Sequence, residues 1–316
     1  KGDVMLKYVL KRLGYILVTL WVIVTCTFFM MKNLPGTPFD AERFSIMTPQ
    51  QQERVLEMYG LNDSLPMQYV KYIKNMLKGD LGTSFTYVNQ DVSKVITGRL
   101  GPSALIGIQA VLIGLAIGLI LGILAAWKHN SGIDYFTMIL AVLGVSVPNF
   151  VAAALLQYYI GLKWGVLPVG FWTGWNCSVL PSIALSFSAT AMVARFMRTE
   201  MLDVLDQDYI VTARAKGLSQ MKVLMRHAVR NSILPVVTIL GPIVVNLMTG
   251  SLAVENIFSI PGIGSLFVDC IKANDYPVIM GITIFYAAFY MLIVLLVDLA
   301  YSLIDPRIRL AKGKES

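Results

Sequence analysis

The stretch GPSALIGIQAVLIGLAIGLILGILAAW, from Gly101 to Trp127, decides the fold, because its 27 residues include no charged side chain. An uncharged apolar run of this length is typical of a helix that crosses a membrane. Five further runs of this kind lie at 13–31, 135–160, 179–197, 233–254 and 277–304. The six runs together contain only two charged side chains, Arg195 and Asp298, so the sequence predicts six transmembrane helices.

The composition of the chain excludes a soluble enzyme. Of its 316 residues, 56% are hydrophobic and 14% are charged, whereas soluble domains carry about 25% charged residues. The mean hydropathy of +0.66 points the same way. We therefore expect an all-α fold, a polytopic membrane helix bundle that sits in lipid.

The distribution of Lys and Arg predicts how the spans are oriented, since short loops rich in these residues stay in the cytoplasm. Fifteen of them lie in four segments on one side of the predicted membrane: 1–12, 128–134, 198–232 and 305–316. The short loops on the other side contain only Lys163 and Lys272. We expect the N-terminus and the C-terminal tail to be cytoplasmic and the segment 32–100 to be extracytoplasmic.

The net charge of +7 follows mostly from this topology. Binding to nucleic acid is the rival explanation of a basic chain. The cations flank the spans, however, and lack the interleaved aromatic residues of a stacking groove. We expect no nucleic-acid partner.

The first apolar run, 13–31, follows several cations, as the apolar part of a signal peptide does. Its nineteen residues exceed the apolar part of a typical signal peptide, and no small-x-small cleavage site follows it. We therefore expect a retained membrane anchor.

The three cysteines, Cys26, Cys177 and Cys270, are an odd number, and their spacing fits neither a zinc site nor a redox pair. Cys177 and Cys270 both fall outside in the predicted topology, where a disulfide can form. Two unpaired thiols are the favoured interpretation.

The extracytoplasmic segment is predicted to contain two helices. Thr48 and Gln51 form a capping box at the start of the first, and Ser64 and Gly79 bracket the second. Apolar and aromatic residues recur at three- and four-residue spacing along the second helix: Tyr69, Tyr72, Ile73, Met76 and Leu77. This face is expected to pack on the outer ends of the spans.

Small residues and prolines are the informative residues within the spans. Gly114, Gly118 and Gly122 recur every four residues, which places a glycine ridge on one helix face where another helix can approach closely. Prolines in the third, fourth and fifth spans are expected to kink or end them: Pro148, Pro181, Pro235 and Pro242.

Catalytic chemistry has no basis in the predicted spans. Both histidines, His129 and His227, lie in cytoplasmic loops, and the sequence offers neither a metal cluster nor a carboxylate pair at membrane depth. His129 beside Asp134 is interpreted as a solvated loop contact. Arg195 and Asp298 lie near the inner ends of their spans, which favours a structural ion pair or snorkelling over a proton relay.

The cytoplasmic loop 198–232 is predicted to fold into two short helices. Asp208 can cap a helix from Tyr209 to Lys216, and Gly217 ends it. Ser219 can cap a second helix that runs to about residue 231. The small side chains of the first helix, Ala213 and Ala215, leave a low surface that a groove on another protein can enclose. A helix pair lying on the membrane surface is the alternative.

Seven blocks of sequence, in the same order along the chain, resemble those of a known family. They are FFMMKNLPGTPF (Phe28 to Phe39), GDLGTSF (Gly79 to Phe85), DYFTMILAVLGVSVPNFV (Asp134 to Val151), TARAKGL (Thr212 to Leu218), RHAVRNSILPVV (Arg226 to Val237), TGSLAVENIFSIPGIGSLFV (Thr249 to Val268) and IDPRIR (Ile304 to Arg309). The chain resembles the inner-membrane permease subunits of ABC importers, specifically the oligopeptide permease B type. Ala213 and Gly217 match the consensus of the ATPase-coupling loop. Val211 and Thr212 stand where that consensus has Glu and its first Ala.

The resemblance implies the type I ABC importer permease fold in the cell membrane of a prokaryote. Such a subunit forms half of the translocation pathway for oligopeptides. Its implied partners are a second homologous permease, two nucleotide-binding ATPase subunits and an extracytoplasmic peptide-binding protein. ATP and Mg would bind to the ATPase subunits; no cofactor is expected on this chain, which has no Walker A pattern. Sister importers for dipeptides, nickel or glutathione are alternatives, and a secondary transporter is a more distant one.

Two candidate sites follow. The resemblance assigns ATPase coupling to a run of residues in the cytoplasmic loop: Tyr209, Thr212, Ala213, Arg214, Ala215, Lys216, Gly217 and Leu218. Pro261, Gly262 and Gly264 prevent regular helix and predict a tight turn between the fifth and sixth spans, near where substrate enters. A passive loop is the alternative for this second site.

Overall fold

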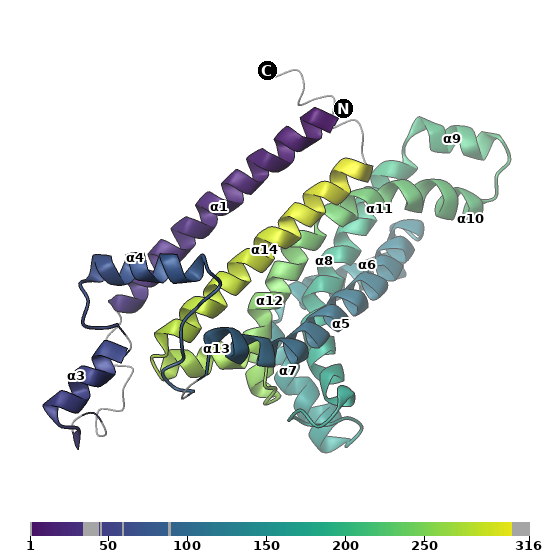
Figure 1. Ribbon diagram of the computed structural model, residues 1–316. Coiled ribbons are helices and arrows are strands. Elements are labelled where there is room, and N and C mark those ends of the chain that lie inside the picture. Colours follow the sequence, from purple (N-terminus) through teal and green to yellow (C-terminus); the bar gives the residue numbers. More distant parts are fainter. Residues whose placement is uncertain (1, 34–43, 45, 59, 88–89, 305–316) are drawn as a thin grey trace. The chain divides into compact units, whose positions relative to one another are not determined.

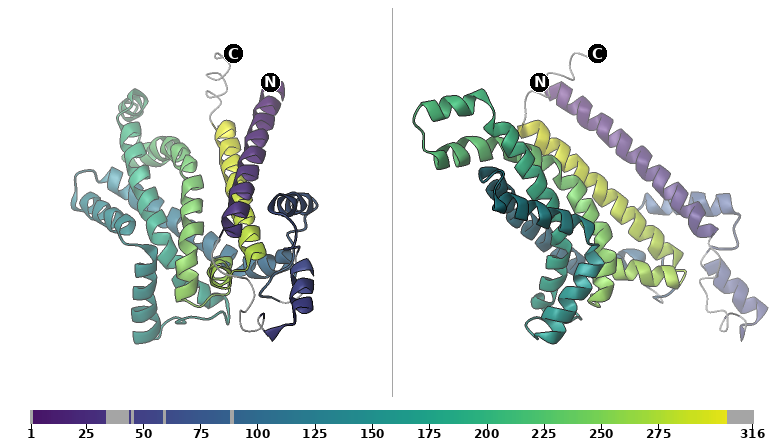
Figure 2. Two further views of the ribbon diagram at one scale, coloured as in Figure 1. Left: turned by 90° about the vertical axis from the view of Figure 1, so that its left-hand side faces the viewer. Right: turned by 180° about the vertical axis from the view of Figure 1, so that it is seen from behind.

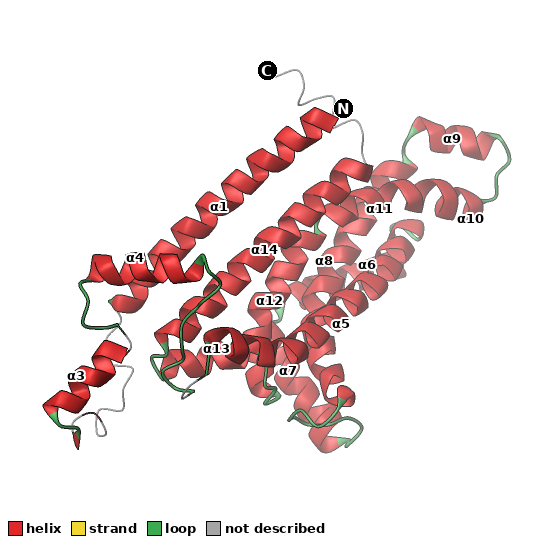
Figure 3. Ribbon diagram, in the orientation of Figure 1, coloured by secondary structure: helices red, strands yellow, loops and turns green. Residues whose placement is uncertain are grey.

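The computed structural model describes residues 2–33, 44, 46–58, 60–87 and 90–304, and over these residues it consists of helices joined by loops (Figure 3). The chain divides into two compact units. The first unit is Lys1–Gly101 with Ser265–Met291, and the second is Pro102–Gly264 with Leu292–Ser316. Figure 1 labels the helices of both units.

The first unit is built from α1 (Gly2–Lys32), α3 (Pro49–Met58), α4 (Leu65–Met76), the beginning of α5 (Val92–Trp127), most of α13 (Ile263–Lys272) and the first half of α14 (Tyr276–Ile304). The second unit holds the rest of α5, then α6 (Gly132–Ser146), α7 (Asn149–Leu156), the π-helix η1 (Gln157–Lys163), the short η2 (Trp175–Ser178), α8 (Val179–Leu205), α9 (Asp208–Ala215), α10 (Gln220–Val223), the π-helix η3 (Leu224–Ala228), α11 (Val229–Thr238) and α12 (Leu240–Ile257).

In the first unit, α4 packs on the end of α1. The Tyr69 ring lies 5.3 Å from the ring of Phe28, and the Tyr69 hydroxyl is 2.7 Å from Thr25 Oγ1. Tyr72 also contacts Phe28, whereas Leu77 is exposed and does not belong to the packed face. The packing expected for this helix is therefore confirmed, except at Leu77.

The capping box predicted in the same unit is also present. The backbone N–H of Thr48 donates to Gln51 Oε1 at 2.9 Å, and the backbone N–H of Gln51 donates to Thr48 Oγ1 at 3.4 Å. Ser64 stands at the N-cap of α4, and Gly79 has a φ of +82° just beyond its end. Both outer helices therefore begin where local sequence signals place them.

In the second unit, the glycine ridge of α5 lies against α8, as expected. A Cβ added at Gly114 would lie 2.6 Å from the Cβ of Ala189, and one at Gly122 would lie 2.7 Å from the carbonyl oxygen of Ala194. Gly144 of α6 is equally close to α8. Helices α5 and α6 thus approach α8 closely enough that side chains at these positions would not fit.

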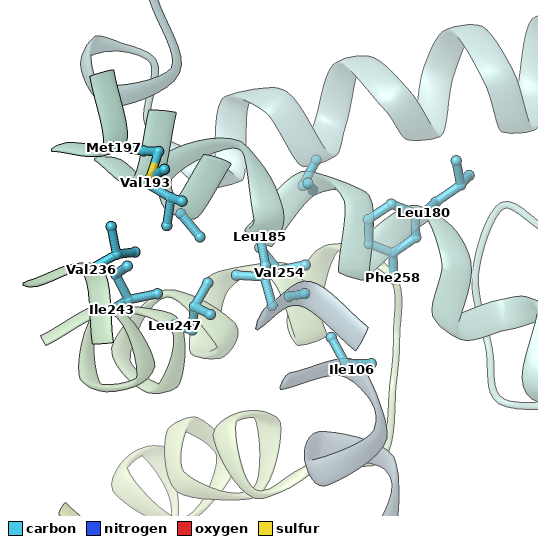
Figure 4. Close-up of a cluster of buried hydrophobic side chains, with 14 of the residues drawn as sticks. Ile106, Leu180, Leu185, Val193, Met197, Val236, Ile243, Leu247, Val254 and Phe258 are labelled. Carbon is cyan, nitrogen blue, oxygen red and sulfur yellow. The ribbon is translucent and has the colours of Figure 1, made fainter. Parts of the chain in front are cut away.

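The core of the second unit forms around α8. Large side chains of α8 and α12 meet there with residues of α5 and α11, and ten of them are labelled in Figure 4: Ile106, Leu180, Leu185, Val193, Met197, Val236, Ile243, Leu247, Val254 and Phe258. Dispersion and close packing hold these helices together, because lipid tails give little hydrophobic drive for helix association.

Four helices have the length and apolar character needed to cross a membrane: Leu10–Lys32, Val92–Trp127, Trp175–Leu205 and Tyr276–Val297. The third predicted span, 135–160, is divided into α6 and the pair α7–η1, which are bent by 101°. Pro148 stands at this break, as expected, because it has no N–H for the helix ladder. If the bent pair is one span, the described residues contain five.

Two of the predicted boundaries in the fourth and fifth spans differ from the structure. Helix α8 continues past residue 197 to Leu205, and Pro181 lies in its first turn without a break. The predicted fifth span, 233–254, is shared between α11 and α12, which meet at Ile239. Pro235 remains inside α11, whereas Pro242 follows the interruption.

Candidate functional site

The inner turn, residues 216–219, separates α9 from α10. Gly217 has a φ of +76°, the left-handed conformation expected from the sequence. The N–H of Gly217 donates to the carbonyl of Arg214 at 3.0 Å, and the N–H of Leu218 donates to the carbonyl of Ala213 at 3.4 Å. These two bonds form a Schellman motif, which satisfies the last carbonyls of α9 and reverses the chain onto α10. Figure 2 shows α9 and α10 side by side.

Helix α9 begins and ends one residue before the predicted positions. Gln207 occupies the N-cap position and makes no side-chain capping bond, so the expected cap at Asp208 is wrong. Asp208 instead stands in the first turn, where its negative charge favours the positive end of the helix dipole.

One face of α9 packs on the chain's own α10. Ile210, Ala213 and Val223 form a small buried cluster, against which Leu218 packs. Ala213 is only 7% exposed, so it does not supply the low outer surface expected from its size. The small volume of Ala213 permits the approach of α9 to α10 within this chain.

The remaining surface of α9 is exposed and partly apolar, with Val211 on the side away from the buried residues and Tyr209 beside them. Val211 is 58% exposed and Tyr209 is 43% exposed. The remaining exposed residues assigned to coupling are Thr212, Arg214, Ala215, Lys216 and Gly217. The coupling residues are therefore divided between an internal contact and a free surface.

The second helix of the loop does not end near residue 231. α10 continues through η3 into α11 without a turn, so the loop connects directly to the fifth predicted span. Two side-chain bonds fix this continuous helix: Asn231 Nδ2 donates to Tyr209 Oη at 3.0 Å, and Ser232 Oγ donates to the carbonyl of Glu200 at 3.3 Å. Helical periodicity continues through this region, and the sequence contains no Gly or Pro that would have ended the helix earlier.

A charged cluster joins the predicted cytoplasmic turn after α5 to α8. His129 Nδ1 is 3.2 Å from Asp134 Oδ2, the contact expected from the sequence. Asp134 is not solvated as predicted, however, because it is 2% exposed and binds Arg198. Arg198 is 64 residues away in the chain, and local sequence carries no signal of this pair.

The outer turn, residues 258–262, connects α12 to α13. Gly264 was expected to prevent regular helix, but it lies in the first turn of α13. Gly262 and Gly264 lie against a buried carboxylate that the sequence analysis missed, that of Glu255 on α12. Ser103 Oγ donates to Glu255 Oε1 at 2.7 Å and accepts the N–H of Ile263 at 2.8 Å. A lone acidic residue just before a glycine-rich turn was the available signal. Phe258 and Ile260 are buried, so the turn folds back onto the bundle.

The loop after η1 is tied to the outer turn. Gln157 Nε2 donates to the carbonyl oxygens of Val169 and Ile257, at 2.8 and 2.7 Å. The N–H of Phe171 donates to the carbonyl of Phe258 at 2.8 Å. These bonds hold the loop after η1 to the end of α12 and to the outer turn.

The remaining candidate residues do not form a chemical site. Arg195 is exposed on α8, whereas the side chain of Asp298 on α14 lies outside the described residues, so their ion pair stays a prediction. Cys177 and Cys270 are free, buried thiols, as the favoured interpretation held. Over the described parts of the chain, His, Cys, Asp and Glu do not gather in a group of three that could hold a metal ion.

These features define a multi-pass membrane protein whose polar structured elements lie at the ends of closely packed apolar helices. The chain belongs to the family of binding-protein-dependent transport system inner membrane components, whose model matches residues 118–310. The model of the N-terminal part of these components matches residues 5–100. The chain is therefore a membrane permease subunit of an ABC import system. The predicted family, the all-α membrane bundle and the membrane localisation are confirmed, whereas the six spans and the cytoplasmic termini stay predictions.

Known proteins resemble the chain over nearly its whole length. The dipeptide transport system permease protein DppB of Lactococcus lactis subsp. cremoris is 46% identical, over 97% of this chain and 100% of that protein. DppB of Bacillus subtilis is 43% identical, over 98% and 99%. The oligopeptide transport system permease protein OppB of Haemophilus influenzae is 39% identical, over 96% and 100%.

A solved structure shows the same fold. A chain in the crystal structure of an amino acid ABC transporter with histidines superposes with a TM-score of 0.51. The two are 20% identical, and the match covers 68% of this chain and 94% of that one. This similarity concerns the arrangement of the helices only.

Proposed function

We propose that this chain forms half of a peptide-conducting pathway across the plasma membrane. Dipeptide permeases at 46% and 43% identity and an oligopeptide permease at 39% support peptides as the substrate class. A second homologous permease supplies the other half. An extracytoplasmic binding protein delivers the peptide, and two ATPase subunits that bind ATP and Mg drive transport.

The exposed face of α9 carries the assignment of ATPase coupling. Val211 and Ala215 are exposed on the side of a short helix away from Ile210 and Ala213, which pack on α10. An exposed apolar helix face between two spans, on the side predicted to be cytoplasmic, is suited to a groove on a partner subunit. The coupling contact is therefore proposed at Val211 and Ala215, and Ala213 acts only as an internal spacer.

The connections of α9 explain how a partner would move the spans. Only Asp206 and Gln207 separate α9 from α8, and both donate backbone bonds to the last turn of α8. On the other side, α10 continues into α11. A displacement of α9 by an ATPase subunit therefore acts directly on the fourth and fifth predicted spans.

The test uses Val211→Asp and Ala215→Trp in the complete importer, reconstituted in vesicles. Both side chains are exposed, so the chain should fold as before while the ATPase subunits dissociate or hydrolyse ATP without moving peptide. Met67→Asp, an exposed apolar-to-acid change on α4, is the matched control and should transport normally. If both α9 variants retain the ATPase subunits and import peptide at the parent rate, the coupling surface is assigned wrongly.

We also propose that the outer turn lies beside the entry of the peptide pathway. Support comes from Ser259, which is exposed with a φ of +52° while its neighbours Phe258 and Ile260 are buried. A photoreactive amino acid at 259 should cross-link a radiolabelled peptide during turnover, and one at 67 should not. Equal cross-linking of peptide at positions 259 and 67 would show that the outer turn is a passive loop.

A further inference from the structure

The cluster around Asp134 connects three helices of the second unit. Arg198 Nε donates to Asp134 Oδ1 at 2.5 Å, and Arg198 Nη2 donates to Asp134 Oδ2 at 2.8 Å. Two parallel bonds between a guanidinium and a carboxylate fix the orientation of the side chains as well as their distance. Asp134 is in the first turn of α6, and Arg198 is on α8.

The turn between α5 and α6 is folded around the same carboxylate. Asn130 has a φ of +57°, and its backbone N–H donates to Asp134 Oδ2 at 3.0 Å. His129 Nδ1 lies 3.2 Å both from this oxygen and from Arg198 Nη2. The carboxylate therefore holds the turn to α6 and holds α6 to α8.

The pair lies at one end of a contact made mostly of small residues. Along this contact Gly122 faces Ala194 and Met197, and Gly144 faces Ala191. Contacts of this kind permit close approach but provide few directional bonds, so one helix can slide along or rotate on the other. The bidentate pair of Asp134 and Arg198 supplies such directional bonds, one helical turn beyond Ala194.

The position of Arg198 on α8 relates its bond with Asp134 to the proposed movement of α9. α8 runs from Arg198 to Leu205 without interruption, and only Asp206 and Gln207 separate it from α9. A displacement of α9 that reaches the fourth predicted span through α8 passes along this part of the helix. Whether α5 and α6 follow depends on how firmly they are attached to α8 there.

We propose that Asp134 and Arg198 are positioning residues that make the adjoining ends of α5, α6 and α8 move as one body when α9 is displaced. This inference rests on the coupling function proposed above for α9. A merely structural pair would stabilise the bundle without affecting how much peptide moves for each ATP that is hydrolysed.

The decisive variant is the double substitution Asp134→Leu with Arg198→Met in the complete importer. Replacing a buried ion pair by apolar residues of similar size is often neutral for stability, so the complex should assemble and melt within about 3 °C of the parent. The directional bond is nevertheless gone. We expect peptide moved per ATP to fall about tenfold, the effect of substitutions that weaken coupling between distant sites.

Two further variants complete the test. Arg198→Lys keeps the charge and loses the planar fork, so it should lower peptide per ATP less than the double variant does. His129→Ala removes an exposed contributor and should leave the ratio unchanged. If the double variant and Arg198→Lys both move as much peptide per ATP as the parent, the proposal is wrong. If the double variant does not assemble, the peptide moved per ATP by Arg198→Lys alone decides the question.

The proposed coupling function fails by a different observation. If α9 does not contact the ATPase subunits, Val211→Asp keeps them bound, whatever the Asp134 and Arg198 variants do. If α9 does contact them and the ion pair is only structural, Val211→Asp releases them while the double variant keeps its normal ratio.

Discussion

The inner and outer turns of the second unit both depend on glycine, but for opposite reasons. Gly217 of the inner turn has a φ of +76°, and a Cβ added there would meet nothing within 4 Å. Gly262 of the outer turn has no such left-handed backbone, yet a Cβ there would collide with Glu255 and Ser103. The inner glycine is needed for its backbone conformation, whereas the outer glycine is needed for its lack of volume.

The inner turn therefore has free space around its glycine, whereas the outer turn is closely packed. The inner turn is open around its glycine and ends in an exposed helix face, which suits a segment that docks on a partner. The outer turn is built around a buried, hydrogen-bonded carboxylate and offers no space for adjustment. Substitutions in the two turns should therefore fail by different mechanisms.

The largest expected effect concerns the sides of the membrane on which the two turns lie. In a Cys26→Ser background, Ser259→Cys should react with a membrane-impermeant maleimide on intact cells, and Ser219→Cys should react only after permeabilisation. Burial raises the pKa of Cys270 to about 12, so this thiol stays protonated and unreactive at pH 7. Labelling of both positions from the same side would refute the assigned topology.

The next effect tests volume at the outer turn. Gly262→Ala places a methyl group against Glu255 and Ser103 and should lower the free energy of unfolding by about 3 kcal/mol, because the buried carboxylate loses its packing and its partner. Thermal unfolding of the purified complex in detergent measures this loss. Gly107→Ala in α5, where a Cβ meets nothing within 4 Å, is the control and should not lower stability. Equal melting of the two variants contradicts the steric explanation.

A smaller effect tests conformation at the inner turn. Gly217→Ala should cost about 1 kcal/mol, because an L-residue is strained at positive φ. Gly217→Trp should cost no more than Gly217→Ala, since the surrounding space is open. A much larger loss in the tryptophan variant, measured by the same unfolding experiment, would show that the inner turn is crowded after all.

The smallest effect refines this result. Gly217→Asn should cost about half as much as Gly217→Ala, because asparagine tolerates the left-handed region better than alanine does. At Gly262 the order should reverse, with asparagine worse than alanine because it is larger. The same order at both turns would remove the distinction between them.

Local signals in the sequence predicted the parts of the structure that depend on local interactions. The uncharged runs located apolar helices, the capping box of Thr48 and Gln51 located α3, and Gly217 located the inner turn. The glycine ridge of α5 was predictable because its four-residue period marks one helix face. In each case the deciding partners lie within a few residues of one another.

The errors about burial concern residues whose partners are distant in the chain. The burial of Asp134 depends on Arg198, and the burial of Glu255 depends on Ser103, 152 residues earlier. Ala213 looked like an outer surface because its contact with Val223 forms only after the chain reverses at Gly217. Sequence spacing within one helix carries no information about such contacts.

The break at Pro148 has a consequence for the lipid around the protein. α6 has 15 residues and rises about 22 Å, less than the roughly 30 Å of a bilayer's hydrocarbon core. The pair α7–η1 is bent by 101° from α6, so it does not extend α6 in the same direction across the core. The bilayer beside this bend is therefore expected to be locally thinned.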